Sequence, residues 1–154
     1  MFKIFNSFIL IFFLMLSSVF SEVLKPNQTI VPKKVVKIQL DGLKKNDAGY
    51  KDQGIEQTWE FAHPNNKIFT GPLERFKQMI KGESYKMLIN HKDHKISEIF
   101  SDENKVIFEV IVMDSEKKYH MFKWQVEKYL KSGPLENCWL TTVVSAPIPL
   151  GSSI

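Results

Sequence analysis

The spacing of apolar residues changes once along this chain, near residue 82. Before that point, Leu73, Phe76 and Ile80 lie at positions i, i+3 and i+7, which places them on one face of a helix over residues 72–81. Gly82 is expected to end this helix in the left-handed conformation. After it, apolar and polar residues alternate, as is typical of strands with one buried face. This change predicts amphipathic helices that pack on a sheet built by the second half of the chain.

Two more helices are predicted ahead of this one. Each has an apolar stripe at helical spacing: Val36, Leu40 and Leu43 in the first, and Ile55, Trp59 and Ala62 in the second. Pro32 begins the first helix, and Asp52 can cap the N-terminus of the second. We expect Pro64 to stop the second helix, because the residue before a proline avoids helical backbone angles.

The second half of the chain predicts five strands joined by polar turns. They cover residues 85–89, 96–100, 106–113, 119–129 and 138–144, and a flexible tail follows at residues 146–154. The chain therefore predicts one α+β domain over residues 32–145, in which three N-terminal helices pack on a mainly antiparallel sheet. The other face of such a sheet is either solvated or available for a homodimer contact.

The first 21 residues have the pattern of a secretory signal peptide. Lys3 precedes an apolar run at residues 8–16, and small residues lie before the expected cleavage after Ser21. An uncleaved anchor is the alternative, although the run is short for a span of about 20 residues. We expect residues 22–31 to link this leader to an exported domain, periplasmic or secreted, with no stable membrane anchor after cleavage.

Charge and cysteine content exclude some classes of partner. The chain has 21 basic and 17 acidic residues, and Arg75 is its only arginine. Scattered lysines without arginine forks do not form a typical nucleic-acid-binding surface. Cys138 is the only cysteine, so an internal disulfide is impossible. His91 and His94 offer metal-type side chains but are expected in a solvated turn without a third ligand, so we expect neither a metal nor a cofactor.

Several short motifs resemble a known family. The most specific is Gly71-Pro72-Leu73-Glu74-Arg75-Phe76, and the others are Asn46-Asp47-Ala48, Asp52-Gln53-Gly54-Ile55, Phe61-Ala62-His63-Pro64-Asn65-Asn66, Leu88-Ile89-Asn90-His91 and Cys138-Trp139-Leu140-Thr141. Over residues 35–144 the chain resembles the uncharacterised bacterial domain-of-unknown-function family 4864. Such proteins are similar to the cystatin-like cone of the nuclear-transport-factor-2 superfamily, which implies a curved sheet. That fold hosts enzymes and non-enzymes, so the resemblance implies no function and no site residues.

Large aromatic side chains are the candidates for a ligand site. They are Trp59, Phe76, Phe122, Trp124 and Trp139, and Arg75, near a helix end, could lie on the rim. In a cone closed by helices these rings could line an apolar cavity. Their spacing favours the other possibility, that they fill the core.

Glu109 is the sharpest candidate for acid–base chemistry, because it interrupts an apolar strand. If the next turn has five residues, Glu109 lies opposite Lys123 on the outer face. If the turn has four, Glu109 shares a face with Trp124, where burial would raise its pKa and suit it to act as a general base or acid. The five-residue turn gathers more apolar residues on one face and is favoured. Asp52 is the second carboxylate considered.

These patterns predict an exported domain of unknown function that binds a small apolar ligand or a protein partner without catalysis. The alternative is a small hydrolase or isomerase that uses a buried carboxylate, either Glu109 or Asp52. A side chain of Glu109 directed away from the helices would remove the main form of the alternative.

Overall fold

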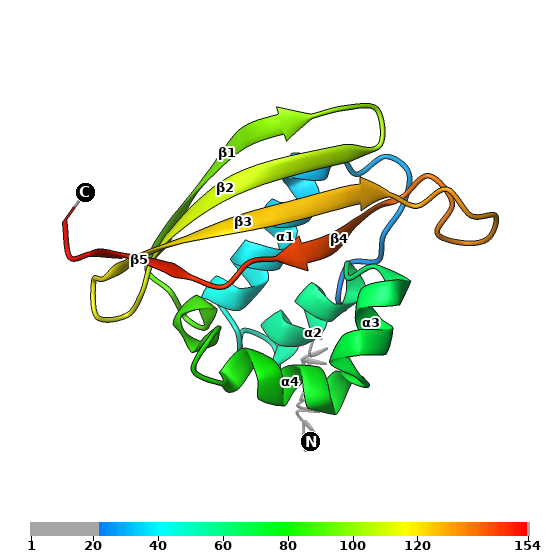
Figure 1. The fold of residues 1–154 in the computed structure, drawn as a ribbon. Helices are drawn as coiled ribbons and strands as arrows, with labels where there is room; N and C mark the ends of the chain where they lie inside the picture. Colours follow the sequence, from blue (N-terminus) through cyan, green and yellow to red (C-terminus); the bar gives the residue numbers. More distant parts are fainter. Residues whose placement is uncertain (1–21, 154) are drawn as a thin grey trace, which may run out of the picture.

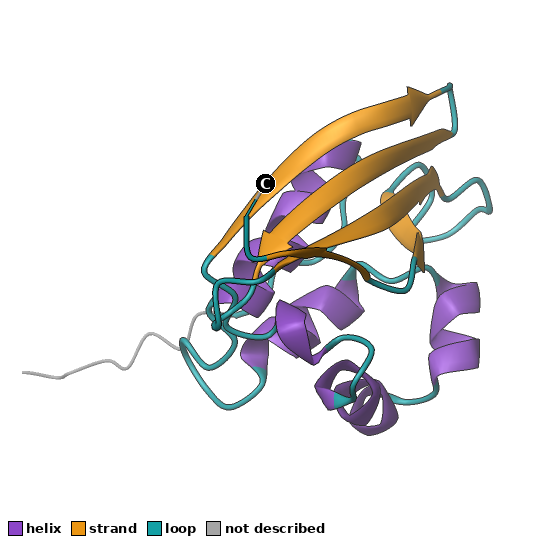
Figure 2. Ribbon diagram, turned by 60° about the vertical axis from the view of Figure 1, so that its left-hand side comes forward, coloured by secondary structure: helices purple, strands orange, loops and turns teal. Residues whose placement is uncertain are grey.

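Two layers make up the fold, a layer of helices and a curved sheet (Figures 1 and 2). The computed structural model describes residues 22–153, so the predicted signal peptide lies outside the described residues. In this range the elements are α1 (Pro32–Lys44), α2 (Gln53–Glu60), α3 (Pro64–Thr70), α4 (Leu73–Lys81), the 3-10 helix η1 (Lys86–Leu88), β1 (Asp93–Ser101), β2 (Lys105–Met113), β3 (Tyr119–Lys128), β4 (Trp139–Val144) and β5 (Ile148–Gly151). No helix of this part of the chain is long and apolar enough to cross a membrane. The predicted α+β class is confirmed, with four α-helices where three were predicted.

The sheet is antiparallel, in the order β1-β2-β3-β4, and β5 pairs with the other end of β3. The predicted register of β2 and β3 is confirmed: Val110 lies opposite Phe122, and Glu109 lies opposite Lys123. Because side chains alternate between faces, this register turns the apolar members of both strands toward the helices. Their buried side chains are Val106, Phe108, Val110, Val112, Phe122, Trp124 and Val126.

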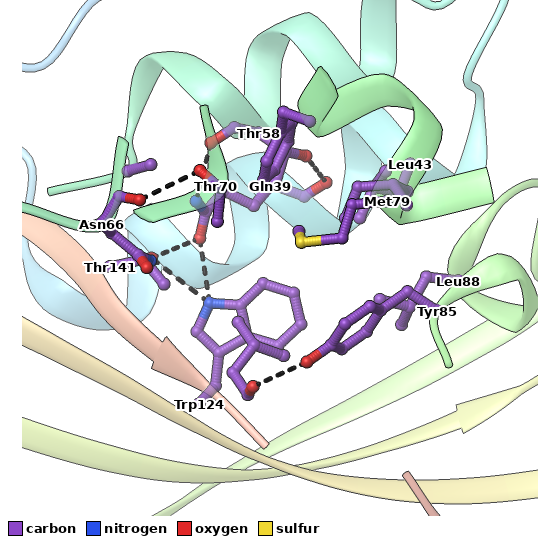
Figure 3. A pocket seen from close by; sticks show the side chains of 14 residues that line it. Gln39, Leu43, Thr58, Asn66, Thr70, Met79, Tyr85, Leu88, Trp124 and Thr141 are labelled. Carbon is purple, nitrogen blue, oxygen red and sulfur yellow. Dashed lines mark hydrogen bonds between the residues drawn. The ribbon is translucent and has the colours of Figure 1, made fainter. Parts of the chain in front are cut away.

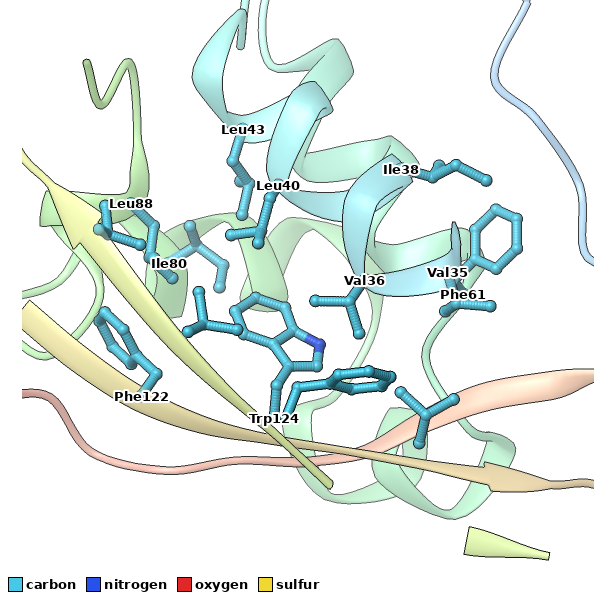
Figure 4. Packing of buried hydrophobic residues seen from close by; sticks show 14 of the residues in the cluster. Val35, Val36, Ile38, Leu40, Leu43, Phe61, Ile80, Leu88, Phe122 and Trp124 are labelled. Atoms are coloured by element: carbon cyan, nitrogen blue, oxygen red, sulfur yellow. The ribbon is translucent and has the colours of Figure 1, made fainter. Parts of the chain in front are cut away.

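Helix α1 crosses this inner face and forms the centre of the core (Figure 4). Its buried apolar side chains are Val35, Val36, Ile38, Leu40 and Leu43. Val36 and Leu40 point toward the indole ring of Trp124 on β3. The apolar stripe predicted from the sequence is therefore the face that packs on the sheet.

Helix α2 packs on α1 through two glycines. A Cβ atom on Gly54 would lie 2.0 Å from the carbonyl oxygen of Gly42, so the two backbones are in direct contact. The side chain of Asn46 reinforces the contact, because its Oδ1 accepts a hydrogen bond from the backbone N–H of Ile55 at 3.0 Å. Only glycine fits at position 54 without separating the two helices.

Helix α2 ends at Glu60, ahead of Pro64 as predicted, but Pro64 also begins a further helix, α3, that the sequence analysis did not predict. Proline is tolerated in the first turn, where its missing N–H has no helical partner to lose. His63 provides the cap, since its Nδ1 accepts a hydrogen bond from the backbone N–H of Asn65 at 3.0 Å. None of the residues of α3 is buried.

Three further predictions of local structure need correction. Gly82 follows α4 in an extended conformation, with φ −75° and ψ 171°, and not in the left-handed one. Residues 85–89 do not form the predicted strand. Lys86–Leu88 form η1 instead, because the backbone N–H of Lys86 bonds back to the carbonyl of Gly82 and that of Leu88 bonds back to the carbonyl of Tyr85. Part of the predicted flexible tail is strand β5.

The contact between α1 and α2 predicts the effect of Gly54→Ala. The new methyl group would meet the backbone of Gly42, which cannot move aside like a side chain, so we expect a loss of about 3 kcal/mol in the free energy of unfolding. Urea titration followed by circular dichroism measures this loss. Gly82→Ala is the control, since its nearest contact is 3.2 Å and its φ is negative; an equal loss in both variants would contradict the account.

Candidate functional site

A cavity of ≈ 110 Å³ lies between the helices and the inner face of the sheet. Its apolar lining comes from α1, α4, η1 and β3 and includes Leu43, Phe76, Met79, Ile80, Leu88 and Trp124. Its polar lining consists of Gln39, Thr58, Asn66, Thr70, Tyr85 and Thr141. Each described helix and the strands β3 and β4 contribute lining residues, so the cavity lies where these elements meet.

Most of the polar groups gather at one end of the cavity, whereas Tyr85 lies beside Leu88 at the other end (Figure 3). Figure 3 shows Asn66, Thr70 and Thr141 gathered at one end, with Leu43 and Leu88 at the other. The indole of Trp124 lies between the two ends. The site therefore suits a molecule with an apolar body and one polar group.

A buried hydrogen-bond network fixes the polar end. The Oε1 atom of Gln39 accepts hydrogen bonds from Trp124 Nε1 at 3.0 Å and from Thr141 Oγ1 at 2.6 Å. The Nε2 atom of Gln39 donates to the carbonyl of Thr58 at 3.0 Å. Trp124 Nε1 also lies 3.3 Å from Thr141 Oγ1. All four residues are buried, so water does not compete for these hydrogen bonds. The hydrogen bonds therefore hold this wall of the cavity in one arrangement.

Three other lining hydroxyls bond to nearby carbonyls. Thr58 Oγ1 donates to Gly54 at 2.9 Å, Thr70 Oγ1 donates to Asn66 at 3.0 Å, and the Tyr85 hydroxyl donates to Val144 at 3.1 Å. Burial raises the pKa of Tyr85, so its hydroxyl stays protonated at neutral pH. These hydroxyls retain oxygen lone pairs that can accept a hydrogen bond, but they supply no base at neutral pH.

Two of the predicted ligand-site aromatics line the cavity. Phe76 on α4 and Trp124 on β3 face the same space from opposite layers. Trp59 packs against Phe76, with ring centroids 5.1 Å apart. Lys67 Nζ lies over the Trp59 ring, 5.2 Å from its centroid. Trp59 therefore supports the wall without lining it.

The remaining predicted ligand residues lie elsewhere. Phe122 is fully buried in the core and is not part of the lining. Trp139 is half-buried on β4, where Lys128 Nζ lies 5.2 Å from its ring centroid. Arg75 is exposed on α4, and its aliphatic stem packs beside Gly71, whose φ is +81°. None of these three side chains lines the cavity.

Neither candidate carboxylate lies in the cavity. Glu109 pairs across strands with Ser97 and Lys123, on the face of the sheet that points away from the helices. Asp52 was expected to cap α2 but makes no capping bond; it adopts φ 64°, and its carboxylate accepts from Lys81 Nζ at 2.6 Å and from Asn46 Nδ2 at 3.1 Å. Burial acts to raise the pKa of Asp52, but these two hydrogen bonds and the positive charges of Lys81 and Lys51 outweigh it and leave the pKa below its usual range. Asp52 is thus an ionised structural group.

The polar lining residues were missed by the sequence analysis, although one signal was present. A buried tryptophan needs a partner for its indole N–H. Gln39 lies on the buried side of the first helix, three residues after Val36, and could have been paired with Trp124 on that ground. Nothing in the sequence pointed to Asn66 or Thr70, because the helix that carries them was itself not predicted.

The histidines expected in a solvated turn are instead part of a packed junction. His91 is 2% exposed; its Nδ1 lies 2.7 Å from the carbonyl oxygen of Leu88, and its Nε2 lies 2.7 Å from His94 Nδ1. His94 Nε2 faces Asp41 Oδ1 on α1 at 3.5 Å. The described residues contain no group of three or more side chains placed to hold a metal ion. The pair joins η1, β1 and α1.

Another histidine, His120, contacts Asp114 at the turn between β2 and β3. The Asp114 Oδ2 to His120 Nε2 distance is 2.7 Å, and Asp114 Oδ1 accepts from the backbone N–H groups of Glu116 and Lys118. The Nδ1 atom of His120 is buried without a partner among the described residues. This dyad fixes the turn and does not line the cavity.

The burial of His91 predicts a specific pH dependence of stability. Burial lowers the pKa of His91 from 6.5 to about 4, so the unfolded chain binds the proton first as the pH falls. Stability that depends on neutral His91 should be lost between pH 6.5 and 4, by about 3 kcal/mol in all. His91→Asn keeps a donor for the Leu88 carbonyl but does not titrate, so the stability advantage of the wild type over this variant should shrink across that range. Urea unfolding at several pH values measures it, and parallel curves would contradict the account.

The chain was compared with protein families, curated proteins and solved structures. The family model described as "Domain of unknown function (DUF4864)" matches residues 25–133, a range that holds all the cavity-lining residues except Thr141 and Val144. No curated protein and no solved structure matches the chain. The family match covers well over half of the sequence and confirms the resemblance to this family, with every quoted motif except Cys138-Trp139-Leu140-Thr141 inside the matched range. The chain belongs to the domain-of-unknown-function family DUF4864.

Proposed function

We propose that this protein is an exported binding domain whose cavity takes up a small, mainly apolar molecule without transforming it. The observation that carries the proposal is the cavity itself, ≈ 110 Å³ in volume and lined by no charged side chain. Protein interiors are close-packed, with few voids larger than a water molecule. Filling an apolar space of this size with matching groups is worth about 2–3 kcal/mol, so a bound molecule would gain contacts with the apolar part of the lining.

The volume limits the size of the ligand. An engineered apolar cavity of about 150 Å³ in another protein binds benzene. A space of ≈ 110 Å³ is somewhat smaller, so it suits a molecule close to benzene in size, with at most about six or seven non-hydrogen atoms. A fatty acid or a steroid would require the helices to move.

The lining favours binding over acid–base catalysis. Tyr85 is its one titratable side chain, and burial raises the pKa of that hydroxyl. The carboxylates considered for a hydrolase or isomerase, Glu109 and Asp52, are both engaged outside the cavity. A general base must come within hydrogen-bond reach of the proton that it removes, and neither of these groups meets that condition for a molecule in this space.

Toluene is a suitable probe of the proposed site, because it has seven non-hydrogen atoms and no polar group. We expect saturable ¹H–¹⁵N chemical-shift changes at the Trp124 indole and the Gln39 side-chain amide, both of which line the cavity. Val144→Phe should weaken binding at least tenfold, since Val144 lines the cavity and a phenyl ring there would fill it.

Val143→Phe is the matched control, because Val143 is the next residue on the same strand and is 48% exposed. It should bind toluene as the wild type does. Absence of saturable shifts in the wild type, or equal affinity in the Val144→Phe variant, would refute binding in this cavity.

A further inference from the structure

We infer that the ligand is a neutral molecule whose polar group donates a hydrogen bond, such as a small phenol or alcohol. The inference rests on the binding function proposed above and narrows it to a chemical class. It follows from the directions of the hydrogen bonds around the cavity.

The hydroxyl groups of the lining have all committed their hydrogens to protein acceptors. Thr58, Thr70 and Tyr85 donate to backbone carbonyls, and Thr141 donates to the Gln39 side chain. The indole N–H of Trp124 is likewise directed at Gln39. A hydroxyl that has given its hydrogen still has oxygen lone pairs, so these groups can accept but not donate. The lining therefore offers a ligand mainly acceptors.

Asn66 provides the one uncommitted polar side chain of the lining. Within residues 22–153 its carboxamide has no hydrogen-bond partner, and it lies at the polar end, beside Thr70 (Figure 3). A ligand hydroxyl can donate to its Oδ1 or accept from its Nδ2, and in the second case its hydrogen remains free for one of the hydroxyl oxygens of the lining. Asn66 and the oxygen atoms around it therefore fit a hydroxyl better than a group that only accepts.

The electrostatics of the lining disfavour an anion. No Lys, Arg or His side chain lines the cavity. A carboxylate or phosphate would lose its hydration there without gaining a positive partner, which is strongly unfavourable. The polar group of the ligand must therefore be neutral.

The apolar end accounts for the rest of the molecule. Leu43, Met79, Ile80 and Leu88 offer only hydrocarbon and thioether surface, and Phe76 and Trp124 offer ring faces. An aromatic ring placed here would bury its apolar surface and leave its substituent at the polar end. Phenol, with seven non-hydrogen atoms, has this shape and the size that the cavity allows.

Four small probes separate the parts of this inference by NMR titration of the full domain. Phenol donates and accepts; benzonitrile only accepts; fluorobenzene has nearly the shape of phenol without its O–H; benzoate is charged. We expect phenol to bind roughly 2- to 10-fold more tightly than fluorobenzene or benzonitrile. This factor corresponds to the net free energy that one hydrogen bond contributes. Benzoate should give no saturable shifts.

Each of the other outcomes has a distinct meaning. If benzonitrile binds as tightly as phenol, the preference for a donor is wrong. If fluorobenzene does so, polar recognition is wrong while the proposed binding of apolar molecules stands. If benzoate binds, neutrality is wrong. If none of the four binds and toluene does not either, the proposed function itself fails.

Asn66→Leu tests the role of the free carboxamide. It removes no protein hydrogen bond, and α3 has no buried residue, so the fold should be unaffected. Phenol should then bind no more tightly than fluorobenzene. Asn65→Leu is the matched control, since Asn65 is exposed and does not line the cavity, and it should keep the preference for phenol. Thr70→Val provides a second test at the same end, and an unchanged preference in both Asn66→Leu and Thr70→Val would overturn the inference.

Discussion

One side-chain amide, that of Gln39, joins the helix layer to the sheet. It connects α1 to β3 through Trp124, to β4 through Thr141 and to α2 through the carbonyl of Thr58. Each of these groups is buried, and a buried polar group that loses its partner costs about 1–3 kcal/mol. The distance between α1 and the two strands is therefore set by the length of these hydrogen bonds as well as by apolar packing. The other helices pack around α1 at the distance that this leaves.

The cavity is a consequence of this arrangement. Helix α1 fills the centre of the inner face of the sheet, but α3 and α4 cover the remainder at a greater distance. Only Phe76 and Ile80 of α4 are buried, and no residue of α3 is. Polar groups drawn from α3 and from the Gln39 network gather at one end of the remaining space, and apolar groups from α4 and η1 gather at the other. The two ends of the site therefore differ in polarity, and this difference allows the chemical class of a ligand to be inferred.

The sequence predicted the parts of the fold that are governed by periodic burial. The stripe of Val36, Leu40 and Leu43 and the placement of Val110 opposite Phe122 follow from the need to bury apolar faces. Helix α3 and η1 depend on local backbone bonds around Pro64 and Gly82, for which apolar spacing gives no signal. Most of the site was missed for the same reason: its polar members are identified by their partners in space, and only Phe76 and Trp124 could be named in advance. The likeness to the nuclear-transport-factor-2 superfamily remains a prediction.

Hydrogen exchange at the three tryptophan indoles tests the central interaction most directly. Trp124 Nε1–H is buried and bonded to Gln39, whereas the indole N–H groups of the half-buried Trp59 and Trp139 have no partner among the described residues. The account predicts that the Trp124 indole proton exchanges only on global unfolding, with a protection that matches the free energy of unfolding, while the other two exchange orders of magnitude faster. If the Trp124 proton exchanged as fast as the other two, Gln39 would not join the layers, and the cavity would lose its fixed wall.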